Sequence, residues 1–166
     1  SRMGKLPDQR AFRDALGCFA TGVTIVTIAA GPRGVPSGIT ASSFNSVSLE
    51  PPLVLFSLER RAHSLKAFLS ARHFAVNVLR AGQEELSARF AEPLADEWAG
   101  IPYVTWDTGA PILTAALASF ECEIRHTYDG GDHVIFVGEV LRMRADPAGK
   151  PLLFFRGRYC GLDGEG

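Results

Sequence analysis

The chain has 166 residues, 46% of them hydrophobic, and 17 basic against 18 acidic residues give a formal net charge of −1. This length suits one domain that buries a core without disulfides or metal ions, so we expect a single domain over residues 1–166 with a flexible arm at residues 1–7. The balanced charge argues against nucleic acid and anionic membranes as partners.

Near the N-terminus, residues 7–20 are predicted to form a helix. Asp8 is a suitable N-cap, because its carboxylate can accept hydrogen bonds from the unpaired amides of the first turn. Phe12, Leu16 and Phe19 recur at intervals of four and three residues, which places them on one helical face. The pattern therefore predicts an amphipathic helix that ends near residue 21.

A hairpin is predicted next. Residues 23–30 are rich in β-branched side chains, which favour strands. The turn sequence Gly31-Pro32-Arg33-Gly34 bounds this strand, and Val35 begins the return strand. The two strands are therefore expected to pair in antiparallel fashion.

The segment from residue 38 to residue 48 combines a strand pattern with small hydroxyl side chains, which a strand on an ordinary core would not carry. These hydroxyls belong to Thr40, Ser42, Ser43, Ser46 and Ser48. With the accessible backbone amides beside them, they suit a planar, hydrogen-bonding ligand with a phosphorylated tail. A serine-rich hairpin on a solvated sheet edge is the alternative, and composition leaves both open.

Two prolines, Pro51 and Pro52, end that segment with a rigid turn. The run Leu53-Val54-Leu55-Phe56 after them is apolar enough to predict a strand buried on both faces. Two helices are predicted beyond it, over residues 64–71 with Leu65, Phe68 and Leu69 on one face, and over residues 83–91. A strand over residues 74–79 separates these helices.

In the last part of the chain, the sequence predicts an extended surface segment followed by a second hairpin. Residues 92–111 carry three prolines and two glycines, so we expect an extended surface segment that is variable or contacts substrate. Residues 113–128 and 134–145 are predicted to be long strands joined by a turn at residues 129–132. Successive antiparallel hairpins with few helices favour a mainly β fold, a closed or split barrel, over a doubly wound sheet.

Metal and disulfide chemistry find no support in the sequence. Cys18, Cys122 and Cys160 are widely spaced and sit among apolar neighbours, so we expect three buried thiols, and we assign no metal site. A G-x-G-x-x-G turn between a strand and a helix is also missing from the sequence, so a nicotinamide cofactor would not use the usual dinucleotide fold. Without a membrane-length apolar run or a secretory signal core, we expect a cytoplasmic protein.

Six sequence blocks, taken in order, resemble the flavin reductase family; they cover residues 19–27, 40–58, 74–79, 87–91, 131–133 and 151–159. The resemblance runs from Phe12 to Leu162. It implies a split β-barrel with antiparallel, Greek-key-like connections and a few peripheral helices, which binds FMN or FAD, usually at a homodimer interface. It also implies NADH or NADPH as the reductant and a separate flavin-dependent monooxygenase as the partner that receives reduced flavin.

The resemblance implies which residues bind the flavin. They are Pro36, Ser37, Gly38, Ile39, Thr40, Ser42, Ser43, Ser57, Leu58, Glu59, His63, Ser64, Arg89 and Phe90. Residues 36–40 would lie along the isoalloxazine and ribityl chain, with the serines at 42 and 43 donating hydrogen bonds. Gly38 would let the backbone approach closely, although a glycine in a strand also marks a bulge.

The flavin phosphate would lie at the N-terminus of the helix over residues 64–71, where unpaired amides and the helix dipole favour an anion. At most one of the two neighbouring arginines, Arg60 and Arg61, is expected to touch it. Arg89 and Phe90 resemble a second contact with the flavin tail. Packing of an amphipathic helix is an equally good reading of Phe90.

His133 follows Gly131 and Asp132 at the head of a strand, and the resemblance places it beside the nicotinamide as the catalytic residue. A neutral imidazole there would stack on the carboxamide or form a hydrogen bond with it. The alternative is a turn histidine that caps its own loop. The nicotinamide side is implied to include Phe155, Arg156, Gly157 and Tyr159; a final core strand with solvent-facing arginines is the alternative for that tail.

Together these expectations predict an NAD(P)H:flavin oxidoreductase, in which hydride passes directly from the nicotinamide to the flavin. Two rivals stay open. One is a non-catalytic flavin-binding electron carrier of the same fold, and the other is a split-barrel oxidase or haem-handling protein. The sequence does not separate FMN from FAD, or NADH from NADPH.

Overall fold

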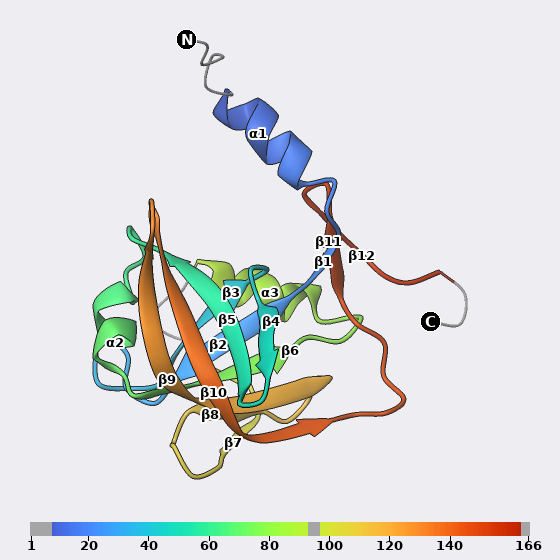
Figure 1. Cartoon of the computed structure of the whole chain (residues 1–166). Coiled ribbons are helices and arrows are strands. Elements are labelled where there is room, and N and C mark those ends of the chain that lie inside the picture. Colours follow the sequence, from blue (N-terminus) through green and yellow to red (C-terminus); the bar gives the residue numbers. More distant parts are fainter. Residues whose placement is uncertain (1–7, 93–96, 164–166) are drawn as a thin grey trace.

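The computed structural model describes residues 8–92 and 97–163, so the flexible arm predicted at residues 1–7 lies outside the described residues. In chain order, the elements of the described chain are α1 (Gln9–Leu16), β1 (Thr21–Gly22), β2 (Thr24–Ile28), β3 (Ser37–Ala41), β4 (Asn45–Leu49), β5 (Pro52–Glu59), α2 (Leu65–Ser70), β6 (His73–Val78), α3 (Glu84–Ala91), β7 (Tyr103–Thr105), β8 (Pro111–Leu113), β9 (Ala118–Gly130), β10 (His133–Ala145), β11 (Leu153–Phe155) and β12 (Arg158–Cys160) (Figure 1).

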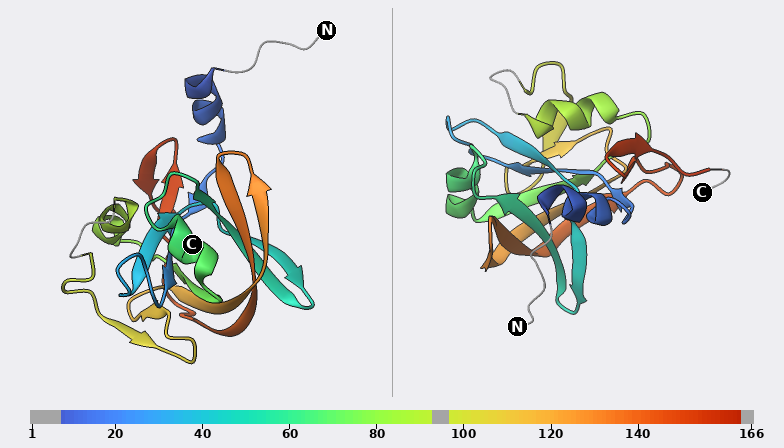
Figure 2. Two further views of the ribbon diagram at one scale, coloured as in Figure 1. Left: turned by 90° about the vertical axis from the view of Figure 1, so that its left-hand side faces the viewer. Right: turned by 90° about the horizontal axis from the view of Figure 1, so that it is seen from above.

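The main sheet, as described, has seven strands in the order β3-β2-β6-β9-β10-β5-β4, and every pair in it is antiparallel. A three-stranded sheet of β1, β11 and β12 and a two-stranded sheet of β7 and β8 lie beside it. Figure 2 shows β9 and β10 bending along their length, which curls the main sheet. The predicted mainly β, antiparallel fold with few helices is confirmed. Because β3 and β4 end the strand order, the curled sheet stays open along one side.

Local turn chemistry produces both predicted hairpins. β2 pairs with β3, and the Gly31 amide donates to the Val35 carbonyl at 2.6 Å across the intervening turn. β9 pairs with β10 around residues 129–132, where Gly131 has a φ of +75° that favours glycine. The two hairpins supply the strands that carry most of the sheet, and both predictions are confirmed.

A cluster of four phenylalanines fills the centre of the core. Phe56 on β5 stacks on Phe136 of β10 at 5.1 Å between ring centroids and meets Phe74 of β6 edge-on at 4.9 Å. Phe68 of α2 closes the cluster against the first two rings. Aromatic pairs at these separations add to the stability gained from burial, so the cluster fixes β5 relative to α2 and β6.

The strand β5 corrects one expectation from the sequence. Val54, Phe56 and Leu58 are buried, but the residues between them, Leu53 and Leu55, are only half-buried. The prediction of burial on both faces is therefore wrong, because the described chain covers the second face of β5 only in part. By contrast, all five residues of β2 are buried, since β2 lies inside the sheet with α3 against it.

The helix α1 begins where the sequence predicts but is shorter. Asp8 accepts a hydrogen bond from the Arg10 amide at 3.1 Å, which confirms the N-cap. The helix stops at residue 16 rather than near residue 21, because Thr21 pairs with β11 as part of β1. The apolar stripe of α1, Phe12 and Leu16, is 54% and 56% exposed, Phe19 beyond the end of the helix is 79% exposed, and α1 projects away from the body of the chain (Figure 1).

Four further expectations differ from the structure. The excursion at residues 92–111 contains β7 and the first residue of β8, so it is partly ordered as sheet, and the long strand expected from residue 113 begins at residue 118. Leu69 points away from the core and is half-exposed. Only Cys122 among the three cysteines is a buried thiol, with burial raising its pKa to about 12. Cys18 and Cys160 are exposed because they lie beside the projecting α1 and in β12.

Candidate functional site

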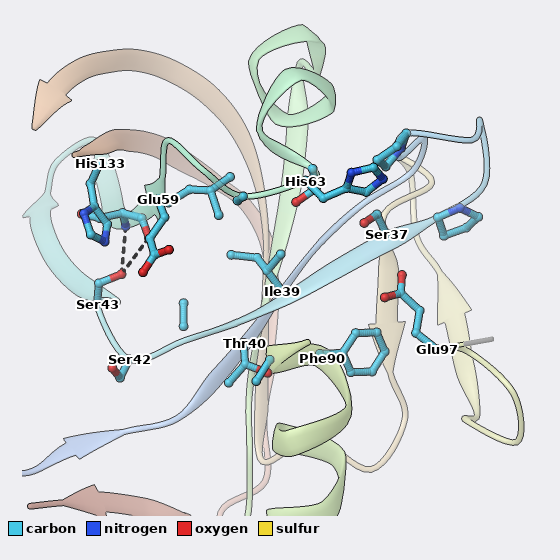
Figure 3. Close-up of a pocket in the computed structure, with 18 of the residues that line it drawn as sticks. Ser37, Ile39, Thr40, Ser42, Ser43, Glu59, His63, Phe90, Glu97 and His133 are labelled. Atoms are coloured by element: carbon cyan, nitrogen blue, oxygen red, sulfur yellow. Dashed lines mark hydrogen bonds between the residues drawn. The ribbon is translucent and has the colours of Figure 1, made fainter. Parts of the chain in front are cut away.

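A cavity of about 700 Å³ lies along the open side of the main sheet, between β3 and β5. The start of α2 and the end of α3 close its other sides (Figure 3). Thirteen of the residues singled out from the sequence line it: Pro36, Ser37, Ile39, Thr40, Ser42, Ser43, Ser57, Leu58, Glu59, His63, Ser64, Phe90 and His133. Strands far apart in the sheet order therefore bring these residues together, and the size suits one small organic ligand.

Two hydroxyl groups in the cavity wall already form hydrogen bonds within the protein. Ser43 Oγ accepts a hydrogen bond from the Ser57 amide at 2.9 Å and donates to the Ser57 carbonyl at 3.3 Å, which ties the chain after β3 to β5. Thr40 Oγ1 donates to the Ser87 carbonyl of α3 at 2.6 Å. A hydroxyl has one proton, so both of these side chains are placed to accept from a ligand rather than donate to it.

Glu97 is a cavity residue that the sequence analysis missed. It is 8% exposed, and its Oε2 atom has no hydrogen-bond partner among the described residues. Burial raises the pKa of this carboxyl, against the opposing effects of the Gly38 amide and the positive charge of Arg33. Arg33 lines the same cavity and was also missed. An acidic residue in a proline-containing surface segment gives no sequence signal of this burial.

The loop that carries Glu97 is fixed by tryptophan contacts. Trp98 Nε1 donates to the Pro36 carbonyl at 2.9 Å, and its ring meets Phe90 of α3 at 4.9 Å between centroids. Arg89 Nη1 reaches the carbonyl of Ala99 at 2.7 Å. These contacts hold the loop against β3 and α3. They fix the position of the Glu97 carboxyl group in the cavity wall (Figure 3).

The raised pKa of Glu97 makes a prediction for stability. The pKa of this carboxyl is higher in the folded protein than the ordinary 4.5. The folded protein therefore loses stability as the pH rises from 4.5 through the raised pKa, because the buried carboxyl must then ionise. Glu97→Gln removes the ionisation, so the variant should melt at a higher temperature than the wild type near pH 7. Thermal unfolding followed by circular dichroism from about pH 4 to pH 8 checks this. An equal difference at every pH would contradict it.

His133 meets the cavity from the head of β10, opposite Glu59 of β5. Its Nδ1 atom lies 2.7 Å from a carboxylate oxygen of Asp132, and this contact lowers the pKa of Asp132. An ionised carboxylate only accepts hydrogen bonds, so Nδ1 donates in this contact, and Nε2 is an acceptor whenever the ring is neutral. His133 therefore bonds its own turn, as the alternative expected, and also lines the cavity; its place beside a nicotinamide stays a prediction.

The sequence profile described as the flavin reductase like domain matches residues 16–163 of this chain. The chain belongs to this family. The FMN reductase (NADH) SmoA of Agrobacterium fabrum is 47% identical over 152 residues, 92% of this chain and 85% of SmoA. The reductase subunit HsaB of a flavin-dependent monooxygenase of Mycobacterium tuberculosis is 41% identical over 160 residues, 95% of this chain and 84% of HsaB.

A solved structure agrees with the family assignment. It is the NADH:FAD oxidoreductase SgcE6 of Streptomyces globisporus, in complex with NAD and FAD fragments, and it superposes with a TM-score of 0.86. The sequences are 40% identical, and the match covers 95% of this chain and 96% of that one. The resemblance that the six sequence blocks suggested is therefore confirmed.

Two of the flavin-binding residues that family resemblance implied do not line the cavity. A side-chain carbon on Gly38 would lie 3.0 Å from the Phe90 ring and 3.3 Å from Ile25, so glycine lets α3 pack on β3. β2 and β3 pair without a register shift, so the strand has no bulge there either. Arg89 faces the loop at Ala99. Phe90 has the expected packing role, since it is buried against Trp98; it also lines the cavity, and its contact with the flavin tail stays a prediction.

The two arginines beside the expected phosphate position are compatible with the expectation that at most one of them touches the phosphate. Arg60 is ion-paired with Asp129 and donates to the Gly131 carbonyl at 2.9 Å, so it braces the β9–β10 turn. Neither Arg60 nor Arg61 lines the cavity. Arg33, from the β2–β3 turn, is instead the arginine on its wall. His63 and Ser64 lie at the start of α2 as predicted and face the cavity.

The tail residues expected on the nicotinamide side of a flavin reductase lie elsewhere in this chain. Phe155, Arg156, Gly157 and Tyr159 form the β11–β12 hairpin, whose two turn residues have φ angles of +51° and +75°. None of the four lines the cavity. Tyr159 is instead 2.7 Å from Ser87 Oγ of α3. One chain does not bring these residues to the cavity, and their role stays a prediction.

The described residues contain no group of three or more histidine, cysteine or acidic side chains arranged to hold a metal ion. None of the helices in the described residues is long and apolar enough to cross a membrane.

Proposed function

We propose that this protein is an NADH-dependent flavin reductase that transfers hydride from the nicotinamide to FMN or FAD and passes the reduced flavin to a separate monooxygenase. The cavity of about 700 Å³ between β3 and β5 carries the proposal, because the residues implied to hold flavin converge on it. The names of the relatives support the choice of NADH as reductant and of both flavins as acceptors.

The residues present fit a flavin. β3 is an edge strand, so its outward backbone groups are not used by the sheet, and those other than the Gly38 amide, which faces Glu97, can bond a planar ring. Ile39 offers an apolar surface in the middle of the cavity, and acceptor oxygens surround it (Figure 3). When bound, the flavin supplies the ring that accepts a hydride; the protein supplies placement and exclusion of water.

In this proposal His133 positions the nicotinamide. Its Nε2 atom is the acceptor that faces outward from the Asp132 contact, and a carboxamide N–H is a suitable donor to it. No side chain needs to act as acid or base, because the hydride moves directly between two cofactor rings. The histidine therefore contributes orientation, which affects rate and nicotinamide affinity together.

His133→Ala is expected to lower turnover, or to raise the KM for NADH, by roughly three- to tenfold without abolishing activity. Steady-state kinetics with NADH varied at saturating flavin measures both parameters. Asp132→Asn is the matched variant, since it keeps the ring but weakens its orientation, and its effect should be smaller. Unchanged kcat and KM in His133→Ala would remove this role.

We also propose that the protein acts as a homodimer in the cytoplasm. The exposed apolar stripe of α1 and the 95% exposed Leu49 at the end of β4 are surfaces that a second copy would cover. A second copy would also supply the β11–β12 residues that one chain does not bring to its own cavity. Size-exclusion chromatography with light scattering tests the dimer, and a monomer at micromolar concentration would contradict it.

The experiment that tests the function is anaerobic stopped-flow absorbance with NADH and each flavin in turn. Rapid loss of the visible band of oxidised flavin is expected, followed by release of the reduced flavin to an added acceptor. Flavin that binds but does not bleach would overturn the proposal. Flavin that bleaches yet stays bound through repeated cycles would favour the electron carrier.

A further inference from the structure

One acidic side chain lacks a hydrogen-bond partner in the wall of the cavity between β3 and β5, which we call the first cavity. Glu97 is 8% exposed, and its Oε2 atom is buried with no partner among the described residues. Figure 3 shows its carboxyl group pointing toward Ser37 on β3, and both residues line this cavity. Buried polar atoms are normally hydrogen-bonded, so an unpaired one in a cavity wall indicates a group that pairs with a ligand.

Burial favours the protonated form of this carboxyl group. The pKa of Glu97 is raised, since the loss of hydration outweighs the hydrogen bond from the Gly38 amide and the positive charge of Arg33. A protonated carboxyl group carries one O–H donor, whereas an ionised one only accepts hydrogen bonds. The same side chain therefore offers the cavity a donor at low pH and a negative charge at high pH.

The neighbouring wall supplies acceptors. The hydroxyl groups of Thr40 and Ser43 already donate their protons to backbone carbonyls, at 2.6 Å and 3.3 Å. A flavin ring carries carbonyl oxygens and ring nitrogens that accept hydrogen bonds, and its phosphate is an anion. Protonated Glu97 can donate to these acceptors, whereas ionised Glu97 cannot donate and repels the phosphate.

We propose that Glu97 binds flavin through its protonated carboxyl group, so that flavin binding is linked to the uptake of a proton. This inference rests on the proposed function, which places flavin in the first cavity. Flavin affinity is full at a pH below the pKa that Glu97 has in the flavin-free protein. It falls as the pH rises through that pKa, because the proton must then be taken from solvent.

Other charged and titratable groups share the first cavity or hold the loop of Glu97. They are Arg33 from the β2–β3 turn, Glu59 from β5, His63 before α2, His133 from β10 and Arg89 from α3. Histidine is the side chain type that loses its charge near neutral pH, which also lowers the affinity for an anionic flavin as the pH rises. The contribution of Glu97 is therefore the difference in pH dependence between the wild type and a variant of this side chain alone.

Further basic groups lie beyond the first cavity. A second cavity of about 600 Å³, between the β2–β3 turn and α2, shares Pro32 and His63 with the first. Lys66, Arg72 and His73 line the second cavity, whereas Glu97 lines the first. Their charges act on flavin affinity equally in the wild type and in a Glu97 variant, so the same comparison removes their effect.

The test is a fluorescence titration with FAD on the wild type and Glu97→Gln. FAD is the probe because the phosphate of FMN itself titrates at about pH 6. Between about pH 5 and about pH 8, the dissociation constant of the wild type should rise about tenfold more than that of the variant. At the upper end of this range the variant should bind FAD more tightly, because its amide keeps a donor at every pH. Glu85→Gln, at an exposed position of α3 outside the cavity, should follow the wild type.

Proton uptake is a second measurement that a purely structural role would not change. Isothermal titration calorimetry in two buffers of different ionisation enthalpy should show that FAD binding to the wild type takes up protons which binding to Glu97→Gln does not. Glu97→Ala has neither charge nor donor, and it should bind FAD about fivefold more weakly than Glu97→Gln at every pH.

Two results would overturn the proposal: equal pH dependence in the wild type and Glu97→Gln, or equal FAD affinity in Glu97→Ala and Glu97→Gln. Either result leaves the proposed function intact, provided that flavin binds and bleaches. A wild type that binds no flavin at any pH would overturn the proposed function together with this inference.

Discussion

Replacement of Ile39 by tryptophan is expected to weaken the binding of both flavins by at least about a hundredfold while the protein stays folded. Ile39 lies on β3 in the middle of the first cavity, between the start of α2 and the Ser43 end (Figure 3). The larger ring projects into the space that the proposed isoalloxazine occupies. Tryptophan is also a good strand residue, so β3 retains its pairing with β2. Fluorescence titration with FMN and with FAD measures the loss.

Val104→Trp is the matched control for that experiment. Val104 is an exposed residue of β7 that lines neither cavity, so the same added ring there should leave flavin affinity unchanged. Far-ultraviolet circular dichroism of both variants establishes that the fold is retained. If Ile39→Trp binds flavin as tightly as the wild type, the space between β3 and β5 is not the flavin site.

Phe56→Ala should cost about 3–5 kcal/mol of unfolding free energy, the range measured when a fully buried phenylalanine is truncated. Phe56 is completely buried and touches three other rings, on α2, β6 and β10. The cavity left behind is lined by rigid aromatic rings, which collapse poorly into it. Urea denaturation followed by tryptophan fluorescence measures the change. Leu69→Ala, at a half-exposed position of α2, should change stability by less than about 0.5 kcal/mol.

The same variant links stability to the site. Phe56 immediately precedes Ser57, Leu58 and Glu59, which form the β5 wall of the first cavity. Loosening this strand should therefore raise the flavin dissociation constant as well. A loss of stability below about 1 kcal/mol would show that the four-ring cluster is not the main support of β5.

The elements that the sequence predicts well are those set by local chemistry. The turn around Gly31 and Gly34, the turn around Gly131 and the cap at Asp8 each depend on residues within a few positions of one another. Local preferences of this kind are predicted correctly, because the tertiary structure of this chain agrees with them. Both hairpins of the sheet follow from them.

Burial is predicted less well, because it depends on residues distant in the chain. The apolar run on β5 does not reveal that one face of the strand is left uncovered. Gly38 suggested either a ligand approach or a bulge, but the reason for it is the ring of Phe90, more than fifty residues later. Glu97 lines the cavity in a loop that Trp98 holds against Pro36, more than sixty residues earlier in the chain.

The candidate site was located chiefly through family resemblance rather than through residue patterns. The hydroxyl-rich segment after Gly38 suggested a polar ligand, but it left the solvated edge as an equal alternative. The resemblance then selected the β5 and α2 residues that complete the cavity. The roles that it implied for Arg89, which bonds the loop at Ala99, and for the β11–β12 tail, which contacts α3 through Tyr159, stay predictions.

The open side of the main sheet has a consequence for local motion. β3 and β5 are not neighbours in the strand order, and Ser43 is the residue that bonds across from the end of β3. A ligand held between them acts as a cross-link that the hydrogen-bond ladder does not provide. Flavin binding should therefore slow amide hydrogen exchange in the hairpin of β2 and β3, which becomes coupled to the rest of the sheet through the ligand it holds.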